Sequence, residues 1–163
     1  MITQNSKGKS QKYDNPAPID NNIKDTTIHT DFDITLSNNR CGASSKFKSD
    51  IKVRCYRFGL TIISLIDKLP NKRSVFIISD QLVRSATSIG ANLVEARASS
   101  SRLEFKKFYE IALKSANETK YWLCLLRDGK FANPETVNTL LNESIEIANM
   151  LASSVIKLKS KKF

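Results

Sequence analysis

The chain has 163 residues, with 26 Lys and Arg against 16 Asp and Glu, which gives a formal net charge of +10 at pH 7. This length suits one domain of ordinary size with a tail and excludes two large domains. No apolar run approaches the roughly 18 residues that a membrane-spanning helix needs, and the N-terminus lacks the apolar segment of a secretory signal. We therefore expect a cytoplasmic protein whose charge favours a polyanionic partner or serves solubility.

The residue types that most metal and acid–base sites use are scarce. The chain has one histidine, His29, and its three cysteines, Cys41, Cys55 and Cys124, form no C-x-x-C pair. No glycine-rich phosphate-binding string and no G-x-S-x-G string occurs. We therefore expect no disulfide framework, no metal site, no cofactor and no enzymatic activity, and we interpret Cys55 and Cys124 as buried thiols.

The composition changes near residue 50. Residues 1–50 are rich in Asn, Ser, Thr, Asp and Lys and show no sustained hydrophobic period, so we predict a disordered extension. Within it, residues 28–36 alternate apolar and polar side chains, which fits either a strand formed on a partner or a coil. The extension is either functional or the product of a misassigned start codon. Residues 51–163 hold 19 of the basic and 10 of the acidic side chains, so the excess positive charge belongs there.

Two helices are predicted over about 51–69 and 74–98. Apolar residues recur at steps of three and four in both segments, and Leu69-Pro70 stops the first helix because a proline disfavours the helical conformation of its predecessor. Gly90 interrupts the second pattern and is a candidate bend. The first seam is Ile51, Cys55, Phe58, Ile62, Leu65 and Leu69; the second is Val75, Ile78, Leu82, Ala86, Ile89, Leu93 and Ala96.

Two further helices follow. Ser101 and Glu104 have the spacing of a capping box, which predicts a third helix that ends near Asp128, with Gly129 in the left-handed position after it. Asn133-Pro134-Glu135 has the pattern of a capped start for the last helix. The third seam is Phe105, Phe108, Ala112, Ser115, Thr119, Trp122 and Leu126; the fourth is Val137, Leu140, Leu141, Ile147, Leu151, Val155 and Leu158.

Four amphipathic helices joined by short connections predict an all-α protein, an antiparallel up-down-up-down four-helix bundle over 51–163. The second helix also carries a polar stripe, which consists of Gln81, Arg84, Ser88, Asn92 and Glu95. This stripe is either a solvated helix face or a hydrogen-bonded network inside the bundle or at a subunit contact. Small residues beside it favour close helix packing.

The segment 81–96, QLVRSATSIGANLVEA, resembles the Q-x-x-R-A-x-x-S-I-x-x-N-I-A-E-G signature of the four helix bundle protein family. Residues 102–118 continue the similarity, with Arg102, Glu104-Phe105, Phe108, Ile111-Ala112, Ser115 and Glu118 in the order and spacing of its R-x-x-E-F-x-x-F-L-x-I-A-x-G-S-x-x-E pattern. The similarity extends from about residue 56 to 158. This sequence departs from the family at Gly90 and Ala96, where proline and glycine are frequent.

This family includes proteins encoded in intervening sequences of bacterial large-subunit ribosomal RNA genes. The resemblance implies a homo-oligomer, a pentameric ring in related proteins. In a related branch, the accessory proteins of diversity-generating retroelements, a basic pentamer binds RNA and a reverse transcriptase. The resemblance supplies no catalytic residues. We assign the matched polar positions to structure or assembly: Gln81, Arg84, Ser88, Asn92, Glu95 and Glu118.

Two functions remain open. The first is nucleic-acid binding, with RNA favoured, by an oligomer whose basic surface lies near the junction of the second and third helices, with Tyr109 and Tyr121 as stacking candidates. The second is a protein–protein adaptor without direct nucleic-acid contact, for example for a reverse transcriptase. The candidate nucleic-acid-binding residues are Arg97, Arg102, Lys106, Lys107 and Lys114.

Overall fold

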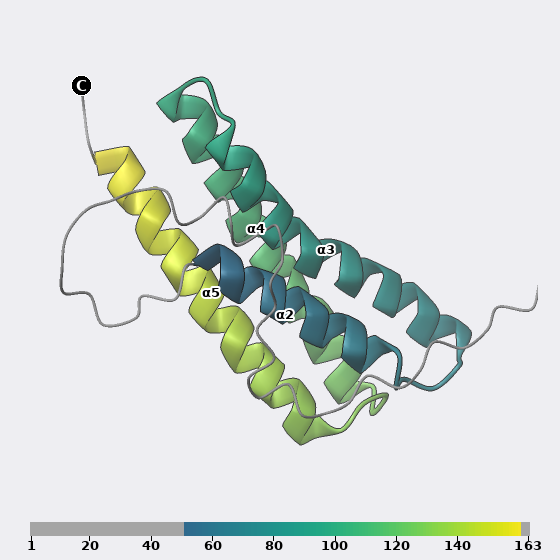
Figure 1. Cartoon of the computed structure of the whole chain (residues 1–163). Helices are drawn as coiled ribbons and strands as arrows, with labels where there is room; N and C mark the ends of the chain where they lie inside the picture. The colour runs from purple at the N-terminus through teal and green to yellow at the C-terminus, as the bar shows by residue number, and fades with distance from the viewer. Residues whose placement is uncertain (1–50, 161–163) are drawn as a thin grey trace, which may run out of the picture. The chain divides into compact units, whose positions relative to one another are not determined.

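The computed structural model describes residues 51–160, which form four helices and contain no strand (Figure 1). The predicted disordered extension over 1–50 and the alternating segment 28–36 lie outside these residues. The helices are α2 (Ile51–Ile66), α3 (Arg73–Arg97), α4 (Arg102–Asp128) and α5 (Pro134–Ser160).

Each helix packs against two others, so the four helices form a closed bundle. Helix α2 contacts α3 and α5, and α4 contacts the same two helices. Because each connection spans only a few residues, consecutive helices run antiparallel (Figure 1). The predicted all-α four-helix bundle is confirmed.

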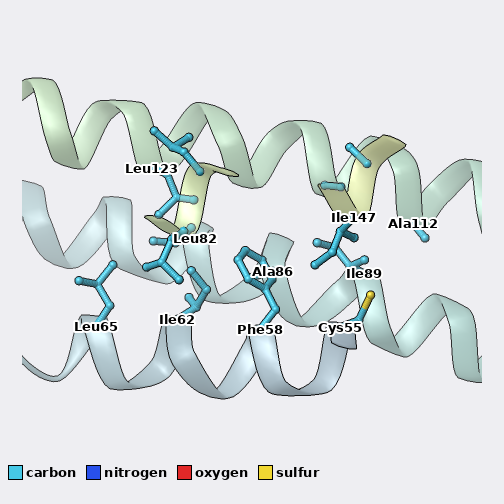
Figure 2. Close-up of a cluster of buried hydrophobic side chains, with 14 of the residues drawn as sticks. Cys55, Phe58, Ile62, Leu65, Leu82, Ala86, Ile89, Ala112, Leu123 and Ile147 are labelled. Atoms are coloured by element: carbon cyan, nitrogen blue, oxygen red, sulfur yellow. The ribbon is translucent and has the colours of Figure 1, made fainter. Parts of the chain in front are cut away.

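The core follows the predicted seams of α2, α3 and α5. Cys55, Phe58 and Ile62 of α2 point toward Leu82 and Ile89 of α3 (Figure 2). Burial of one such aliphatic side chain stabilises the fold by about 1.5–3 kcal/mol, so these seams supply most of the driving force. The largest fully buried aliphatic side chains are Ile62, Leu82, Ile89, Leu93, Leu123, Leu126, Ile147, Leu151 and Val137.

Helix α4 contributes smaller side chains to the core than its sequence predicts. Three members of the predicted seam, Phe105, Phe108 and Trp122, are only half-buried. The buried positions of α4 are short residues and two leucines, which suits the contact of α4 with α3. The buried residues of α4 are Ala112, Ser115, Ala116, Thr119, Leu123 and Leu126.

Helix α2 is the shortest of the four, with 16 residues against 25 in α3 and 27 in α4. It ends at Ile66 rather than at the predicted residue 69, because the amide of Leu69 donates to the carbonyl of Ile66 at 3.0 Å in a tightened last turn. Near its start, Cys55 lies opposite Gly90, where a Cβ would be 3.7 Å from that of Cys55. Helix α3 runs unbroken through Gly90, and the α3–α4 hairpin therefore extends beyond the first turn of α2 (Figure 1).

The end of α4 differs from the prediction in one residue. Lys130, with φ of 56°, holds the left-handed position, whereas Gly129 has φ of −73°. The amides of Lys130 and Phe131 donate to the carbonyls of Arg127 and Leu126, both at 3.0 Å, which is the Schellman pattern. Gly129 is needed for a different reason: a Cβ there would lie 2.5 Å from the Cε2 atom of Phe131.

Two substitutions in this turn should therefore change stability in opposite directions. Lys130→Gly removes the cost of a left-handed side-chain-bearing residue and should raise the free energy of unfolding by about 1 kcal/mol. Gly129→Ala should lower it by about 1–3 kcal/mol, because the new methyl group overlaps the Phe131 ring. Urea denaturation followed by circular dichroism measures both changes, and a stabilising Gly129→Ala would contradict this description of the turn.

Candidate nucleic-acid interface

Helix α4 begins with a side-chain cap that fixes the turn after α3. The hydroxyl of Ser101 accepts a hydrogen bond from the amide of Glu104 at 3.1 Å, as the capping-box spacing predicts. The Glu104 carboxylate accepts from the amide and the hydroxyl of Ser100, at 2.8 and 2.9 Å, one residue earlier than expected. These donors lower the pKa of Glu104 below its ordinary value of 4.5.

The candidate cations gather around this capped turn. Arg97 is the last residue of α3, Arg102 is the first of α4, and Lys106 and Lys107 follow one turn later. Arg97 and Lys107 are exposed, and Arg102 and Lys106 are half-exposed. Four of the five predicted nucleic-acid-binding residues are therefore brought together at one end of the bundle.

Helix α5 adds one cation that the sequence analysis did not assign to this surface. The Nζ atom of Lys159 lies 3.3 Å from Glu110 Oε1, which brings Lys159 beside the third turn of α4. Because consecutive helices run antiparallel, the end of α5 lies at the same end of the bundle as the start of α4, and this order was a signal that could have located Lys159. We call the combined set the basic end: Arg97, Arg102, Lys106, Lys107 and Lys159.

Three carboxylates of the described residues lie close to these five cations. Glu110 pairs with Lys159, Glu104 accepts hydrogen bonds from Ser100, and Glu95 is exposed in the last turn of α3. Five cations against three carboxylates leave a formal charge of +2 among these side chains, the sign that a phosphate-binding surface requires.

Lys114 lies apart from the basic end. It follows Lys107 by seven residues, so the two share one exposed side of α4 at a separation of about 10 Å along the axis. Tyr121 is seven residues further on and is 58% exposed, well away from the basic end. Tyr109, in contrast, lies one turn after Lys106, and its ring centroid is 4.8 Å from that of Phe105.

The structure divides the predicted polar stripe of α3 into an inner and an outer part. Ser88 and Ser115 share a hydrogen bond of 3.0 Å between their hydroxyls, which joins α3 to α4. The side-chain amide of Asn92 donates to the carbonyl of Ser88 at 2.7 Å and to its hydroxyl at 3.0 Å, within α3. Arg84 and Glu95 are exposed, and an assembly role for these outer residues stays a prediction.

Gln81, the remaining stripe residue, and Glu118, the matched polar position on α4, make local contacts. Gln81 is half-buried and donates to Asp80 at 3.4 Å. Glu118 is exposed and accepts from the indole nitrogen of Trp122 at 3.2 Å. Neither of them links α3 to α4.

Buried hydroxyls also join α4 to both of its neighbours. Thr119, a member of the predicted seam of α4, donates to the hydroxyl of Ser85 on α3 at 3.1 Å. Ser144 of α5 donates to the carbonyl of Ala116 on α4 at 3.3 Å. Ser85, Thr119 and Ser144 are all buried, and these hydrogen bonds offset the cost of removing their hydroxyls from water.

An exposed apolar surface runs along α2 and α3. Leu60 and Ile63 on α2 are 40% and 39% exposed, and Phe76 on α3 is 74% exposed. Gly59 of α2 lies against Thr87 of α3, where the two helices are in contact. At helical spacing Tyr56, Leu60 and Ile63 share one side of α2, and Phe76, Val83 and Val94 share one side of α3. We call this set the apolar face: Tyr56, Leu60, Ile63, Phe76, Val83 and Val94.

The α2–α5 contact leaves a shallow groove. Two hollows of about 640 and 410 Å³ share Thr61 and Leu140. At its rim the guanidinium of Arg54 donates to both oxygens of Glu143, at 2.6 and 2.8 Å, and this hydrogen bonding raises the pKa of Arg54.

Residues 51–160 lack both a metal-binding cluster and a membrane-spanning helix. They contain no group of three or more His, Cys, Asp or Glu side chains that could hold a metal ion. No helix among them is long and apolar enough to cross a membrane. Cys55 is buried as predicted, whereas Cys124 is half-buried.

Comparisons with known proteins agree with the resemblance drawn from residues 81–118. The model of the 23S rRNA-intervening sequence protein family matches residues 48–153. A crystal structure of a protein of unknown function from the S23 ribosomal protein family of Bacteroides thetaiotaomicron is similar, with 40% sequence identity and a TM-score of 0.61 over 65% of this chain and 98% of that chain. A comparison with curated proteins gives no match.

The cap at the start of α4 makes the fold sensitive to acid. Because the pKa of Glu104 is lowered in the folded state, its contribution to stability is present above pH 4.5 and is lost as the pH falls through the folded-state pKa. Glu104→Gln should therefore lower the melting temperature at pH 7. The difference from the unmodified protein should shrink as the pH falls below about 4.

Thermal melts at several pH values measure this effect. Ser100→Ala is the matched control, because it removes the hydroxyl donor and keeps the amide donor, and its effect should be smaller than that of Glu104→Gln. A difference that is constant across the pH range would contradict a charged cap.

Proposed function

The chain belongs to the 23S rRNA-intervening sequence protein family, and from this premise we propose that it is a non-enzymatic, cytoplasmic RNA-binding protein whose basic end contacts the phosphate backbone. One observation carries the proposal. Three helices contribute five cations to one end of the bundle, and the carboxylates of the described residues near them are Glu95, Glu104 and Glu110, of which Glu110 pairs with Lys159.

The cations of the basic end suit phosphates in different ways. Arg97 and Arg102 flank the capped turn and can each offer a planar pair of donors to phosphate oxygens. Lys106 and Lys107 are point charges on flexible stems, which adapt to a backbone without reading its sequence. The start of α4 adds the positive end of a 27-residue helix to the same surface.

A second proposal is self-assembly through the apolar face. Exposed apolar patches of this kind mark protein–protein contacts in soluble proteins, since water favours their removal. Arg84 and Glu95 lie on the outer side of α3, so a neighbouring copy seated on that helix would cover them as well. Assembly into a ring, a pentamer in the related proteins, would multiply the positive charge offered to one RNA.

The adaptor alternative uses the same face. A protein partner such as a reverse transcriptase would then take the place of a second copy, and no direct contact with nucleic acid would be needed. The two proposals differ in one measurable respect, the salt-dependent binding of RNA by the protein alone.

Substitutions in the basic end should weaken RNA binding in a salt-dependent way. Each phosphate contact releases a counterion, so removing two lysines should reduce the slope of log Kd against log salt concentration by about 1 to 2. Fluorescence anisotropy with a labelled RNA measures this slope for the double variant Lys106→Gln/Lys107→Gln.

The matched control is Lys68→Gln/Lys72→Gln, which removes the same charge at the opposite end of the bundle. It should leave the slope almost unchanged. Equal slopes for the two double variants would show that RNA binding depends on the total charge of the protein and not on the basic end. The absence of RNA binding even at about 50 mM salt would favour the adaptor role.

Charged residues in the apolar face should prevent assembly. Light scattering on a size-exclusion peak should give a multiple of the chain mass for the unmodified protein and the mass of one chain for Leu60→Asp/Ile63→Asp, because a buried carboxylate without a partner is strongly unfavourable. Ile156→Asp is the control, since Ile156 is 65% exposed on α5, outside the apolar face. A monomeric unmodified protein would contradict self-assembly.

A further inference from the structure

We infer that the hollow between the end of α2 and the start of α5 binds a small amphiphilic carboxylate, whose charge meets two lysines while its apolar chain lies along the α2–α5 groove. This hollow is at the end of the bundle opposite the basic end, and its ligand is independent of the proposed RNA binding. The side chains that line it and the backbone conformation of one of its lysines carry the inference.

The hollow has an apolar floor and a volume of about 410 Å³. Leu65 and Leu140, both buried, line it together with the half-buried ring of Phe131. The volume lies within the range of pockets that bind small molecules. A second hollow, of about 640 Å³, shares Thr61 and Leu140 with it, so the two form one groove along α2 and α5, which lie side by side (Figure 1).

The polar side chains that line the smaller hollow include donors and no carboxylate. Lys68 and Lys130 are exposed, and their ammonium groups form no ion pair with a described residue. The hydroxyls of Ser64 and Thr136 form no hydrogen bond within the described part of the chain. A carboxylate, which only accepts hydrogen bonds, suits such a set of donors.

The neighbouring polar groups leave these lysines available. Thr61 donates to the carbonyl of Arg57 at 2.9 Å, and Asn133 accepts from two backbone amides at the start of α5. Asp67 and Glu135, the carboxylates next to the hollow in sequence, are exposed and do not line it. The side chains that line the hollow therefore carry a formal charge of +2.

Lys130 has a backbone conformation that is unfavourable for a lysine. Its φ of 56° lies in the left-handed region, which glycine adopts without a steric cost. The turn itself requires no lysine there, because its hydrogen bonds join backbone groups only. Strained residues of this kind gather at functional sites, and binding an anion is a role that a glycine could not fill.

The rest of the groove suits an apolar chain. Phe58 and Leu140 are buried side chains of the larger hollow, and Val53 beside them is half-buried. The charges of that hollow balance, with Arg54 and Arg57 against Glu143 and Glu146. A phosphate ion would use the lysines and leave the apolar floor in water, whereas an amphiphilic carboxylate covers both.

Isothermal titration calorimetry of the full chain with sodium dodecanoate, below the concentration at which it forms micelles, tests this site. Dodecanoate should bind saturably. Decanoate should bind about tenfold more weakly, because each buried CH₂ group changes affinity by about threefold to fourfold. Dodecyltrimethylammonium, which has the same chain and the opposite charge, should not bind.

Variants locate the site. Lys68→Gln/Lys130→Gln should weaken dodecanoate binding by about tenfold. The matched control is Lys107→Gln/Lys114→Gln, which removes the same charge from the exposed side of α4, outside the groove, and should bind dodecanoate as the unmodified protein does. Lys130→Gly alone should weaken binding and raise the melting temperature, so loss of structure could not be the cause of its weaker binding.

Three results would overturn the inference. The first is the absence of saturable dodecanoate binding to the unmodified protein. The second is equal weakening by the two double variants, and the third is equal affinity for dodecanoate and dodecyltrimethylammonium. Each of these results would leave RNA binding by the basic end unaffected, because the two sites share no residue.

Discussion

The close packing of α3 on α4 is the contact on which the other features depend. Ala112 and Ala116 are fully buried on α4, and Ser85 and Ser115 are nearly so, which lets the two helices approach closely because the distance between helix axes is set by the side chains at the contact. The Ser88–Ser115 hydrogen bond of 3.0 Å fixes the register. The result is a long hairpin, and its turn brings Arg97, Arg102 and Lys106 together at one end of the bundle.

The apolar face runs along α2 and α3, and the basic end lies at the tip of α3, α4 and α5. The two surfaces meet on α3, where Val94 of the apolar face is three residues before Arg97 of the basic end. An assembly through the apolar face that leaves the basic end of each copy accessible would concentrate cations from several chains on one RNA.

Local signals in the sequence were sufficient to predict the helices. The caps at Ser101 and Asn133 are contacts within a few residues, so their spacing alone locates the starts of α4 and α5. The seam of α4 could not be predicted in the same way. Periodicity assigns Phe105 to the core face, but the depth at which a side chain on that face is buried depends on the tertiary packing, and Phe105 is only half-buried.

The candidate site was predictable only as far as it is contiguous in sequence. Arg97, Arg102 and Lys106 lie within ten residues of one another, and their clustering follows from a short turn between two helices. Lys159 comes from another helix, and its place beside Glu110 depends on the tertiary fold. The polar stripe was predictable only as a set of residues on one side of α3. Its spacing does not distinguish Asn92, which is half-buried and donates to Ser88, from Arg84, which is exposed.

The central claim is that the basic end is the RNA-binding surface, and crosslinking tests it most directly. A single-stranded RNA that contains 4-thiouridine would be irradiated with the full chain, and the crosslinked peptides would be identified by mass spectrometry. The account predicts crosslinks within residues 97–109 and 157–159 that disappear at high salt. Crosslinks confined to the apolar face or to the opposite end of the bundle would contradict it.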